Sequence, residues 1–154
     1  MTYKDYTKRK SEEFGALPIF WAFSESQLAE AMEKRGYKLE DAGRVLYRFG
    51  HGGFYLKTDA AVIKEYFERD HHRELKKLME EEPGFAEEAI EYEMRNHEVP
   101  INWQGDFDVC EIFCGACEYG EYKNGADYLR EAGYSDRVIR IYKDTAVKIC
   151  REDW

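Results

Sequence analysis

Long apolar runs are missing from this sequence, and their absence limits the classes of protein it can belong to. No stretch approaches the roughly 20 apolar residues that span a bilayer, so we expect no membrane partner. Residues 1–13 are polar and charged and lack the apolar centre of a signal peptide, which predicts a cytoplasmic protein with a flexible N-terminal arm. The fold is expected to begin at the apolar segment FGALPIFWAF, residues 14–23.

Cysteine is scarce as well, and basic residues are outnumbered by acidic ones. Four cysteines among 154 residues are too few for a disulfide scaffold, and in a cytoplasmic protein they are expected to be reduced thiols. Lys and Arg number 23 against 32 Asp and Glu, which gives a net charge of −9. Because such a chain repels phosphate backbones and anionic lipids, we expect no direct contact with nucleic acid and regard a cationic protein surface as the more natural partner.

The residues that are abundant suffice for one hydrophobic core. Apolar residues make up 44% of the chain and aromatic residues 16%, and the length fits a single globular domain over residues 14–154. Ser24 and Gln27 match a helix capping box, and Gly36 is placed to end the helix that follows. The runs RVLYRF and FYLKT, separated by GHGG, predict a β-hairpin.

Apolar residues at helical spacing predict that the rest of the chain is mainly helical. The predicted helices run from Asp59 to Gly84, from Phe85 to Glu98, from Ala126 to Ala132 and onward from about Ser135. The fold class is therefore α+β: a mostly α-helical single domain with one small β-hairpin.

Three cysteines lie in the segment VCEIFCGAC at C-x3-C-x2-C spacing: Cys110, Cys114 and Cys117. This spacing resembles the cluster motif of radical S-adenosylmethionine enzymes, but only 37 residues follow it and no strand–helix alternation is visible. A zinc site would need Cys150 or His97 as fourth ligand. Because positions 110, 114 and 117 share one helix face, we prefer a stripe of small buried residues, with no metal and no cofactor.

Two further groups of residues are candidates for chemistry. His97 and Glu98 could act as a general base and an orienting carboxylate, but His97 lies on the apolar side of its helix and adjacent helical residues point about 100° apart. They are weak catalytic candidates, and a non-enzymatic function is the better prediction. The other group is a tight hairpin turn that a ligand could approach, formed by Gly50, His51, Gly52 and Gly53 and followed by Lys57 and Asp59.

Carboxylates gather on two of the predicted helices. A solvated face is the plain interpretation, and the alternative is a surface that imitates a nucleic-acid backbone and occupies a cationic groove of a partner. The candidate partner-binding residues are Glu80, Glu81, Glu82, Glu87, Glu88 and Glu91. His71, His72 and Glu74, which precede them, are expected on a solvated surface.

The segments LPIFWAFS, GHGGFYLKTD and NHE, in that order over residues 17–98, resemble a family of small uncharacterised proteins of bacteriophages, prophages and gut Firmicutes. The resemblance implies an origin on a mobile element. It leads to the hypothesis of a protein that binds and inhibits a host protein, such as a nucleic-acid-targeting defence factor, as anti-CRISPR proteins do. Two alternatives stay open: a small hydrolase or metal-dependent enzyme that uses His97 and Glu98, and a phage structural or assembly protein. The oligomeric state is left open.

Overall fold

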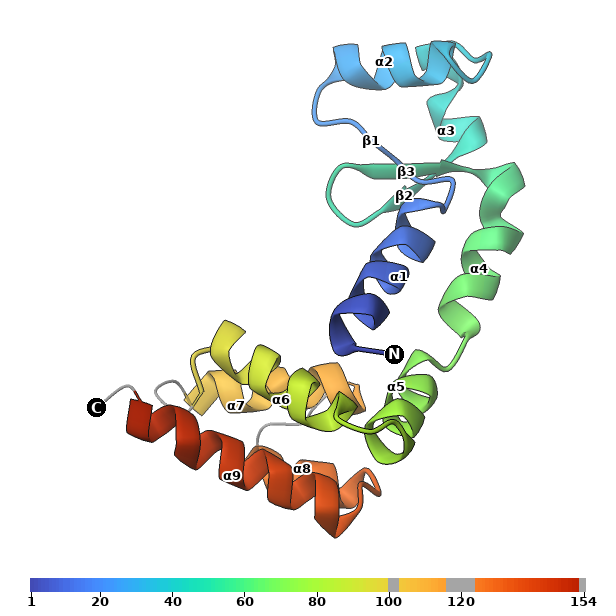
Figure 1. The fold of residues 1–154 in the computed structure, drawn as a ribbon. Coiled ribbons are helices and arrows are strands. Elements are labelled where there is room, and N and C mark those ends of the chain that lie inside the picture. Colours follow the sequence, from blue (N-terminus) through green and yellow to red (C-terminus); the bar gives the residue numbers. More distant parts are fainter. Residues whose placement is uncertain (100–102, 116–123, 153–154) are drawn as a thin grey trace. The chain divides into compact units, whose positions relative to one another are not determined.

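The computed structural model describes residues 1–99, 103–115 and 124–152 (Figure 1). Contacts divide the chain into two compact units, unit 1 with Met1–Thr7 and Asp70–Trp154 and unit 2 with Lys8–Arg69. Each unit has its own cluster of buried apolar residues. The described elements are mostly helices with one small antiparallel sheet, which confirms the predicted balance of helix and strand. The number of domains stays a prediction.

Unit 2 is built on three antiparallel strands in the order β1, β3, β2: β1 is Phe20–Trp21, β2 is Leu46–Phe49 and β3 is Gly53–Leu56. Strands β2 and β3 form the predicted hairpin, in which Phe49 pairs with Gly53. Strand β1 pairs with β3 on the other side and was not predicted. Its two residues are too few to show the alternation that identifies a strand.

Helix α2, Glu25–Glu33, begins at the predicted cap. The Ser24 hydroxyl accepts a hydrogen bond from the backbone N–H of Gln27 at 3.1 Å. The Gln27 side chain, however, accepts from the N–H of Phe23 at 2.8 Å, one residue further back than a capping box requires. The chain that enters α2 is therefore fixed by two side-chain hydrogen bonds.

The two faces of this sheet pack against different helices. On one face, Phe20 and Leu46 are buried with Met32 of α2, near the short helices η1 (Leu39–Asp41) and α3 (Ala42–Val45). On the other face, aromatic rings contact one another in a continuous series that joins the strands to α1 (Tyr3–Gly15) and to α4 (Ala60–Glu68), which follows η2 (Lys57–Asp59). The series runs through Trp21, Phe49, Phe67, Tyr66 and Phe14.

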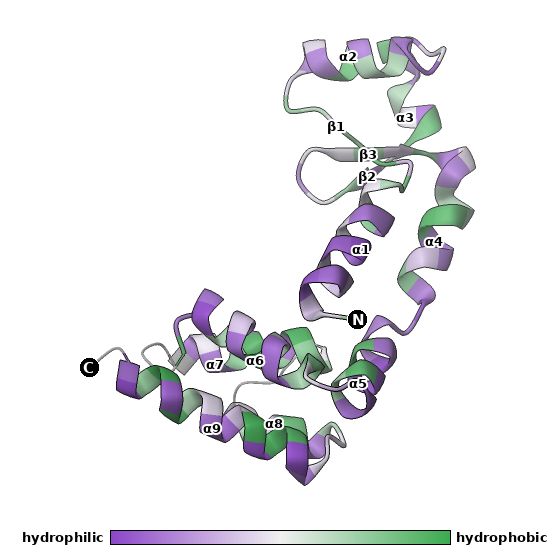
Figure 2. Ribbon diagram, in the orientation of Figure 1, coloured by the Kyte–Doolittle hydropathy of each residue, from purple (hydrophilic) through white to green (hydrophobic). Residues whose placement is uncertain are grey.

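The secondary structure described in unit 1 consists of helices. Its helices are α5 (His71–Glu81), α6 (Phe85–Asn96), α7 (Trp103–Cys114), α8 (Gly125–Glu131) and α9 (Asp136–Glu152), and it includes the start of α1. Each of these five helices places apolar residues in one shared core, and the apolar stripes of α8 and α9 are visible in Figure 2. The side chains of Phe85, Ile90 and Val138 in this core are almost completely buried. None of the described helices has the length and hydropathy to cross a membrane.

Residues 1–13 do not form the predicted flexible arm. Most of them belong to α1, where Tyr3 and Tyr6 lie one turn apart and are buried. Both rings meet the edge of the Phe85 ring, with centroids 5.7 and 5.8 Å apart. The prediction was wrong because it averaged the polarity of the segment, while two tyrosines at helical spacing are enough to attach it.

The helix predicted from Asp59 to Gly84 is two helices. Helix α4 ends at Glu68, Arg69 is extended, and Asp70 begins α5 by accepting a hydrogen bond from the backbone N–H of Arg73 at 2.9 Å. Residues 68–74, between the apolar positions Phe67 and Leu75, are all polar, so the apolar pattern is itself interrupted at the break. The local signal was Asp70, a preferred N-cap residue.

Candidate functional site

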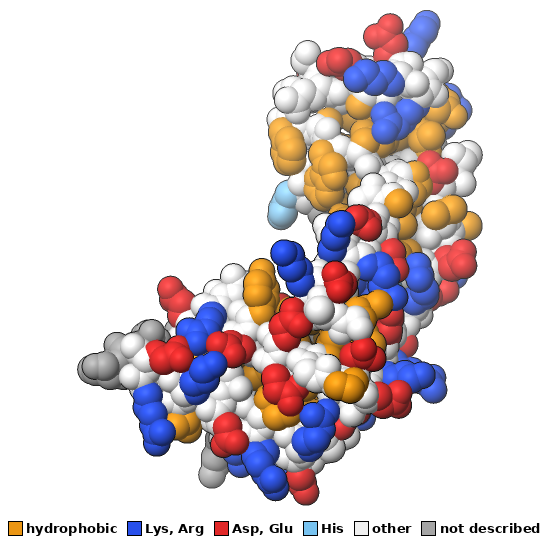
Figure 3. All heavy atoms as spheres, viewed as in Figure 1, with side chains coloured by type: hydrophobic (Ala, Val, Ile, Leu, Met, Phe, Trp, Pro, Cys, Tyr) orange, Lys and Arg blue, Asp and Glu red, His pale blue; other side chains and the backbone are white. Residues whose placement is uncertain are grey.

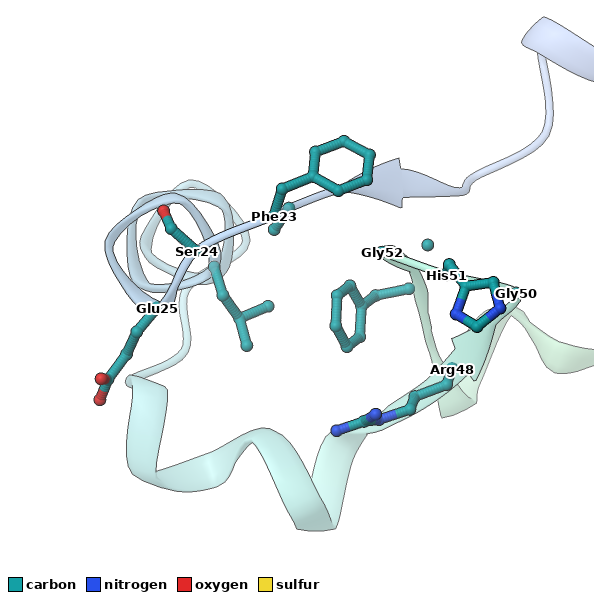
Figure 4. A pocket seen from close by; sticks show the side chains of 11 residues that line it. Phe23, Ser24, Glu25, Arg48, Gly50, His51 and Gly52 are labelled. Carbon is teal, nitrogen blue, oxygen red and sulfur yellow. The ribbon is translucent and has the colours of Figure 1, made fainter.

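A hollow of about 470 Å³ in unit 2 lies between the start of α2 and the turn that joins β2 to β3 (Figure 4). It brings the predicted turn residues together with side chains from β1, β2 and α2. Lys57 and Asp59, predicted with the turn, belong to η2 and do not line it. The lining residues are Ala22, Phe23, Ser24, Glu25, Leu28, Arg48, Gly50, His51, Gly52, Gly53 and Phe54.

The ring of Phe23 lies directly against the turn. Gly52 has a φ of +85°, and a Cβ built there would meet the Phe23 ring at less than 3.0 Å. A glycine is thus required twice, for the backbone conformation and for the space that the ring occupies. The carbonyl of Gly52 also accepts the N–H of Ala22 at 2.8 Å. This hydrogen bond fixes the backbone next to Phe23, yet Phe23 itself is 75% exposed.

Charged groups stand on opposite sides of this hollow. Figure 4 shows Arg48 and His51 on the hairpin, with Glu25 across from them at the start of α2. Within the residues that the structure describes, the side chains of Arg48 and His51 have no hydrogen bond or ion pair, and both are exposed. A guanidinium and an imidazole with unused donors can bind a carboxylate or a phosphate.

Exposed apolar side chains are concentrated in the same unit. Of the eight large hydrophobic side chains that are exposed in the described residues, five belong to unit 2: Trp21, Phe23, Tyr47, Val62 and Phe67. Figure 3 shows hydrophobic side chains gathered over its strands. Trp21 and Phe49 flank Gly53 in the sheet, and because Gly53 has no side chain their rings meet across it at 6.2 Å. A surface of this kind marks a site of interaction.

The net negative charge of the chain comes from unit 1. Unit 2 has 11 Lys and Arg against 10 Asp and Glu, whereas unit 1 has 12 against 22. The net charge of −9 therefore says little about what unit 2 can bind.

Most of the carboxylates predicted to bind a partner are occupied within unit 1. Glu80 accepts the N–H of Ser135 at 2.7 Å, and Glu82 pairs with the N-terminal amine at 2.6 Å. Glu87 lies 3.7 Å from Arg137, and Glu88 accepts the N–H of Lys4 at 3.2 Å. Glu91 contacts Lys148 and Arg95, and these hydrogen bonds lower its pKa. The exposed side chain of Glu81 has no hydrogen bond or ion pair within the described residues.

His97 is accompanied by carboxylates other than the predicted one. Its Nε2 lies 3.6 Å from Glu93 and its Nδ1 lies 3.9 Å from Asp108 of α7. Glu93 is buried and accepts a hydrogen bond from the Tyr3 hydroxyl. Sequence reasoning missed Glu93, although its spacing of three and four residues from Ile90 and Ala89 places it on the apolar face of α6.

The segment NHE forms the end of α6. Glu98 has a φ of +58°. The N–H of Val99 donates to the carbonyl of Met94 at 2.9 Å, and the N–H of Glu98 donates to the carbonyl of Arg95 at 3.4 Å. This is the Schellman arrangement, in which glycine usually takes the position that Glu98 occupies. His97 and Glu98 therefore have a structural role, which is to end α6.

Replacing Glu98 by Gly is expected to stabilise the protein by about 0.5–1 kcal/mol, because glycine adopts positive φ without the cost that other residues bear. Urea unfolding measures the change. The matched control is Asn96→Gly, two residues earlier at the last position of α6, which should destabilise by about 0.3–0.5 kcal/mol. If Glu98→Gly is the destabilising variant, the Glu98 side chain makes an interaction that outweighs its backbone strain.

The described cysteines differ in burial and do not form one buried stripe. Cys110 is completely buried on α7 and donates its thiol hydrogen to the carbonyl of Gly125 at 3.1 Å, as the buried interpretation predicts. Cys114 at the end of α7 and Cys150 on α9 are only partly buried, and Cys117 lies outside the described residues. Among the described residues, no group of three or more His, Cys, Asp or Glu side chains is arranged to hold a metal ion.

Comparison with known proteins gives one match. The model of a family described as a family of unknown function (DUF7659) matches residues 2–109. The matched range contains every residue that lines the hollow in unit 2 and ends directly before Cys110, so all four cysteines lie outside it. No curated protein and no solved structure matches the chain.

Proposed function

This chain belongs to the family of unknown function DUF7659, and we propose that it acts by binding a partner protein at the hollow of unit 2. The observation that carries the proposal is that one hollow is lined both by the exposed ring of Phe23 and by Arg48, whose guanidinium has no hydrogen bond or ion pair within the described part of the chain. Aromatic and arginine side chains contribute most of the binding energy at protein interfaces. A binding function requires no catalytic group.

The lining of the hollow defines the chemistry of the partner. Leu28 and Phe54 supply apolar surface, and Arg48 with His51 favours a negative group at the hairpin side. The partner is therefore expected to insert an apolar side chain next to a carboxylate. The exposed Trp21 and Tyr47 rings lie on the opposite face of the sheet and are not part of this surface.

A second candidate is the hypothesis of an acidic surface that binds a cationic groove of a host protein and thereby inhibits it. The charge of unit 1 favours it, because 22 carboxylates against 12 basic groups produce an attractive field for a cationic partner. Since five of the six predicted carboxylates have partners inside the unit, Glu81 and the more exposed Glu87 and Glu88 are the residues on which this candidate depends.

Pull-down from a host lysate with matched variants distinguishes the two surfaces. The double variant Phe23→Ala/Arg48→Glu is expected to weaken capture of a saturable partner at least about tenfold, since it removes an aromatic anchor and reverses a charge. Lys64→Glu is the control, because it makes the same charge change at an exposed residue of α4 outside the hollow. Each variant must keep the melting temperature of the parent within about 2 °C for the comparison to count.

Loss of capture only in the triple variant Glu81→Lys/Glu87→Lys/Glu88→Lys would favour the acidic surface instead. Capture that survives both sets of substitutions, or no saturable partner at all, would contradict both candidates. The enzyme that uses His97 and Glu98 and the phage assembly protein stay predictions, and for the latter a symmetric oligomer in solution would be the first sign.

A further inference from the structure

A second hollow, of about 270 Å³, lies in unit 1 at the end of α7. The start of α5, the end of α7 and the residues that follow α8 all contribute to it. It is lined by Asp70, His72, Arg73, Lys76, Phe113, Cys114, Ala132 and Tyr134. A thiol, an imidazole and two cations therefore face one cavity.

The lining of this hollow carries more basic than acidic side chains, although unit 1 as a whole is acidic. Unit 1 carries 22 carboxylates, but Asp70 is the one acidic residue among the eight that line the hollow, and one of its oxygens accepts the N–H of Arg73 as a helix cap. The side chain of Arg73 has no hydrogen bond or ion pair within the described residues and is exposed. Its charge is thus available to an anion that enters.

Lys76 is held in place from two sides. Its Nζ donates to the carbonyl of Ala132 at 3.1 Å and lies 5.7 Å from the centre of the Tyr134 ring. A Cβ built on Gly133 would come within 2.8 Å of this nitrogen, so the glycine leaves the space for the ammonium group. The hydroxyl of Tyr134 in turn donates to the carbonyl of Phe113 at 2.7 Å. This wall of the hollow is built by fixed contacts.

The imidazole of His72 lies against the chain next to Cys114. A Cβ built on Gly115 would be 3.4 Å from its Cε1, which places the ring beside the residue that follows the cysteine. Cys114 is partly exposed at this point, whereas Cys110 one turn earlier is completely buried. A partly exposed thiol surrounded by Lys, Arg and His is the setting in which protein thiols react as thiolates.

We propose that Cys114 is a reactive thiol and that this hollow recruits anionic low-molecular-weight disulfides to it. The Cys114 thiolate attacks one sulfur of the disulfide, and a new S–S bond forms as the old one breaks. The electron pair of the broken bond leaves on the second sulfur as a thiolate, so the cysteine is oxidised and the small molecule is reduced. Arg73 and Lys76 raise the local concentration of the anionic reagent, and their charge favours the thiolate.

The test compares two reagents that differ in charge: 5,5′-dithiobis(2-nitrobenzoate), a dianionic disulfide, and 2,2′-dithiodipyridine, a neutral one. Rates are measured by stopped flow with the full chain at pH 7.5. One fast-reacting thiol is expected, and it should disappear in Cys114→Ser but remain in Cys117→Ser and Cys150→Ser. Cys150 is the matched control, because it is a partly buried cysteine of the same unit that does not line the hollow.

Arg73→Gln should slow the dianionic reagent about threefold to tenfold and the neutral reagent less than about twofold, with an unchanged melting temperature, because the Arg73 side chain is exposed. Lys76→Met is the second variant, and added salt should reduce the preference for the anion. The proposal is wrong if the fast thiol survives Cys114→Ser, if Cys150 reacts as fast, or if Arg73→Gln affects both reagents equally.

Discussion

The protein is expected to lose stability steeply as the pH rises above 10, by up to about 4 kcal/mol per pH unit. Burial raises the pKa of Tyr3, Tyr134 and Tyr142 far above the ordinary value of about 10. Below pH 10 the folded and unfolded states both keep these protons, so the stability is fully present. Above pH 10 the unfolded chain releases three protons that the folded chain retains, and each contributes about 1.4 kcal/mol per pH unit.

Neighbouring groups strengthen the effect of burial. The hydroxyl of Tyr3 donates to Glu93 and that of Tyr142 donates to Asp106, so ionisation would place two negative charges in contact inside the protein. Asp106 also accepts the N–H of Gly125 at 2.6 Å, which joins α7, α8 and α9. Losing the proton of Tyr142 therefore disrupts a link between three helices.

Tyrosinate absorbance and circular dichroism, followed together from pH 8 to 12, measure this behaviour. Of the 12 tyrosines, three should ionise only in the step in which helicity is lost. Tyr142→Phe should lower stability at neutral pH, because Asp106 loses a donor, and should also make the alkaline decline less steep by one proton. Tyr47→Phe, at an exposed residue, should change neither. Gradual ionisation of all tyrosines near pH 10 with unchanged helicity would contradict the prediction.

The second large effect is expected for Gly105→Ala in α7. A Cβ built at Gly105 would lie far under 3.0 Å from the carbonyl oxygen of His97, at the end of α6. The obstacle is backbone, which cannot move aside as a flexible side chain does, so α6 and α7 would have to separate. We expect a loss of about 3 kcal/mol, because overpacking outweighs the gain of about 1 kcal/mol that alanine brings to a helix.

Gly43→Ala is the matched control for that substitution. Gly43 lies in the short helix α3, and a Cβ built there meets nothing within 4 Å. Urea unfolding should show this variant unchanged or slightly more stable than the parent, while Gly105→Ala unfolds at a clearly lower urea concentration. Equal midpoints for Gly105→Ala and the parent would mean that the two helices do not approach as closely as described.

The helices and the hairpin were open to prediction because their signals are local. Ser24 caps α2 and the segment GHGG lies at the turn of the hairpin, as predicted. Both features depend on residues within four positions of one another. The same reasoning missed β1 and the break at Asp70, and it described residues 1–13 as an arm. For β1 and residues 1–13 the outcome depended on partners far away in the sequence, such as Phe54 for Phe20 and Phe85 for Tyr3, whereas the break at Asp70 had a local signal that was overlooked.

The candidate sites show the same division. The sequence by itself determined that His51 and three glycines share a turn, that carboxylates gather on α5 and α6, and that Cys110 and Cys114 share a helix. Only the tertiary structure decided that Phe23 lies over the turn and lines one hollow with Arg48, that most of the carboxylates have partners inside unit 1, and that Cys114 lines a second hollow with His72 and Lys76. The physical reason is that hydrogen bonding and helical spacing act over a few residues, whereas packing brings together side chains that the sequence separates.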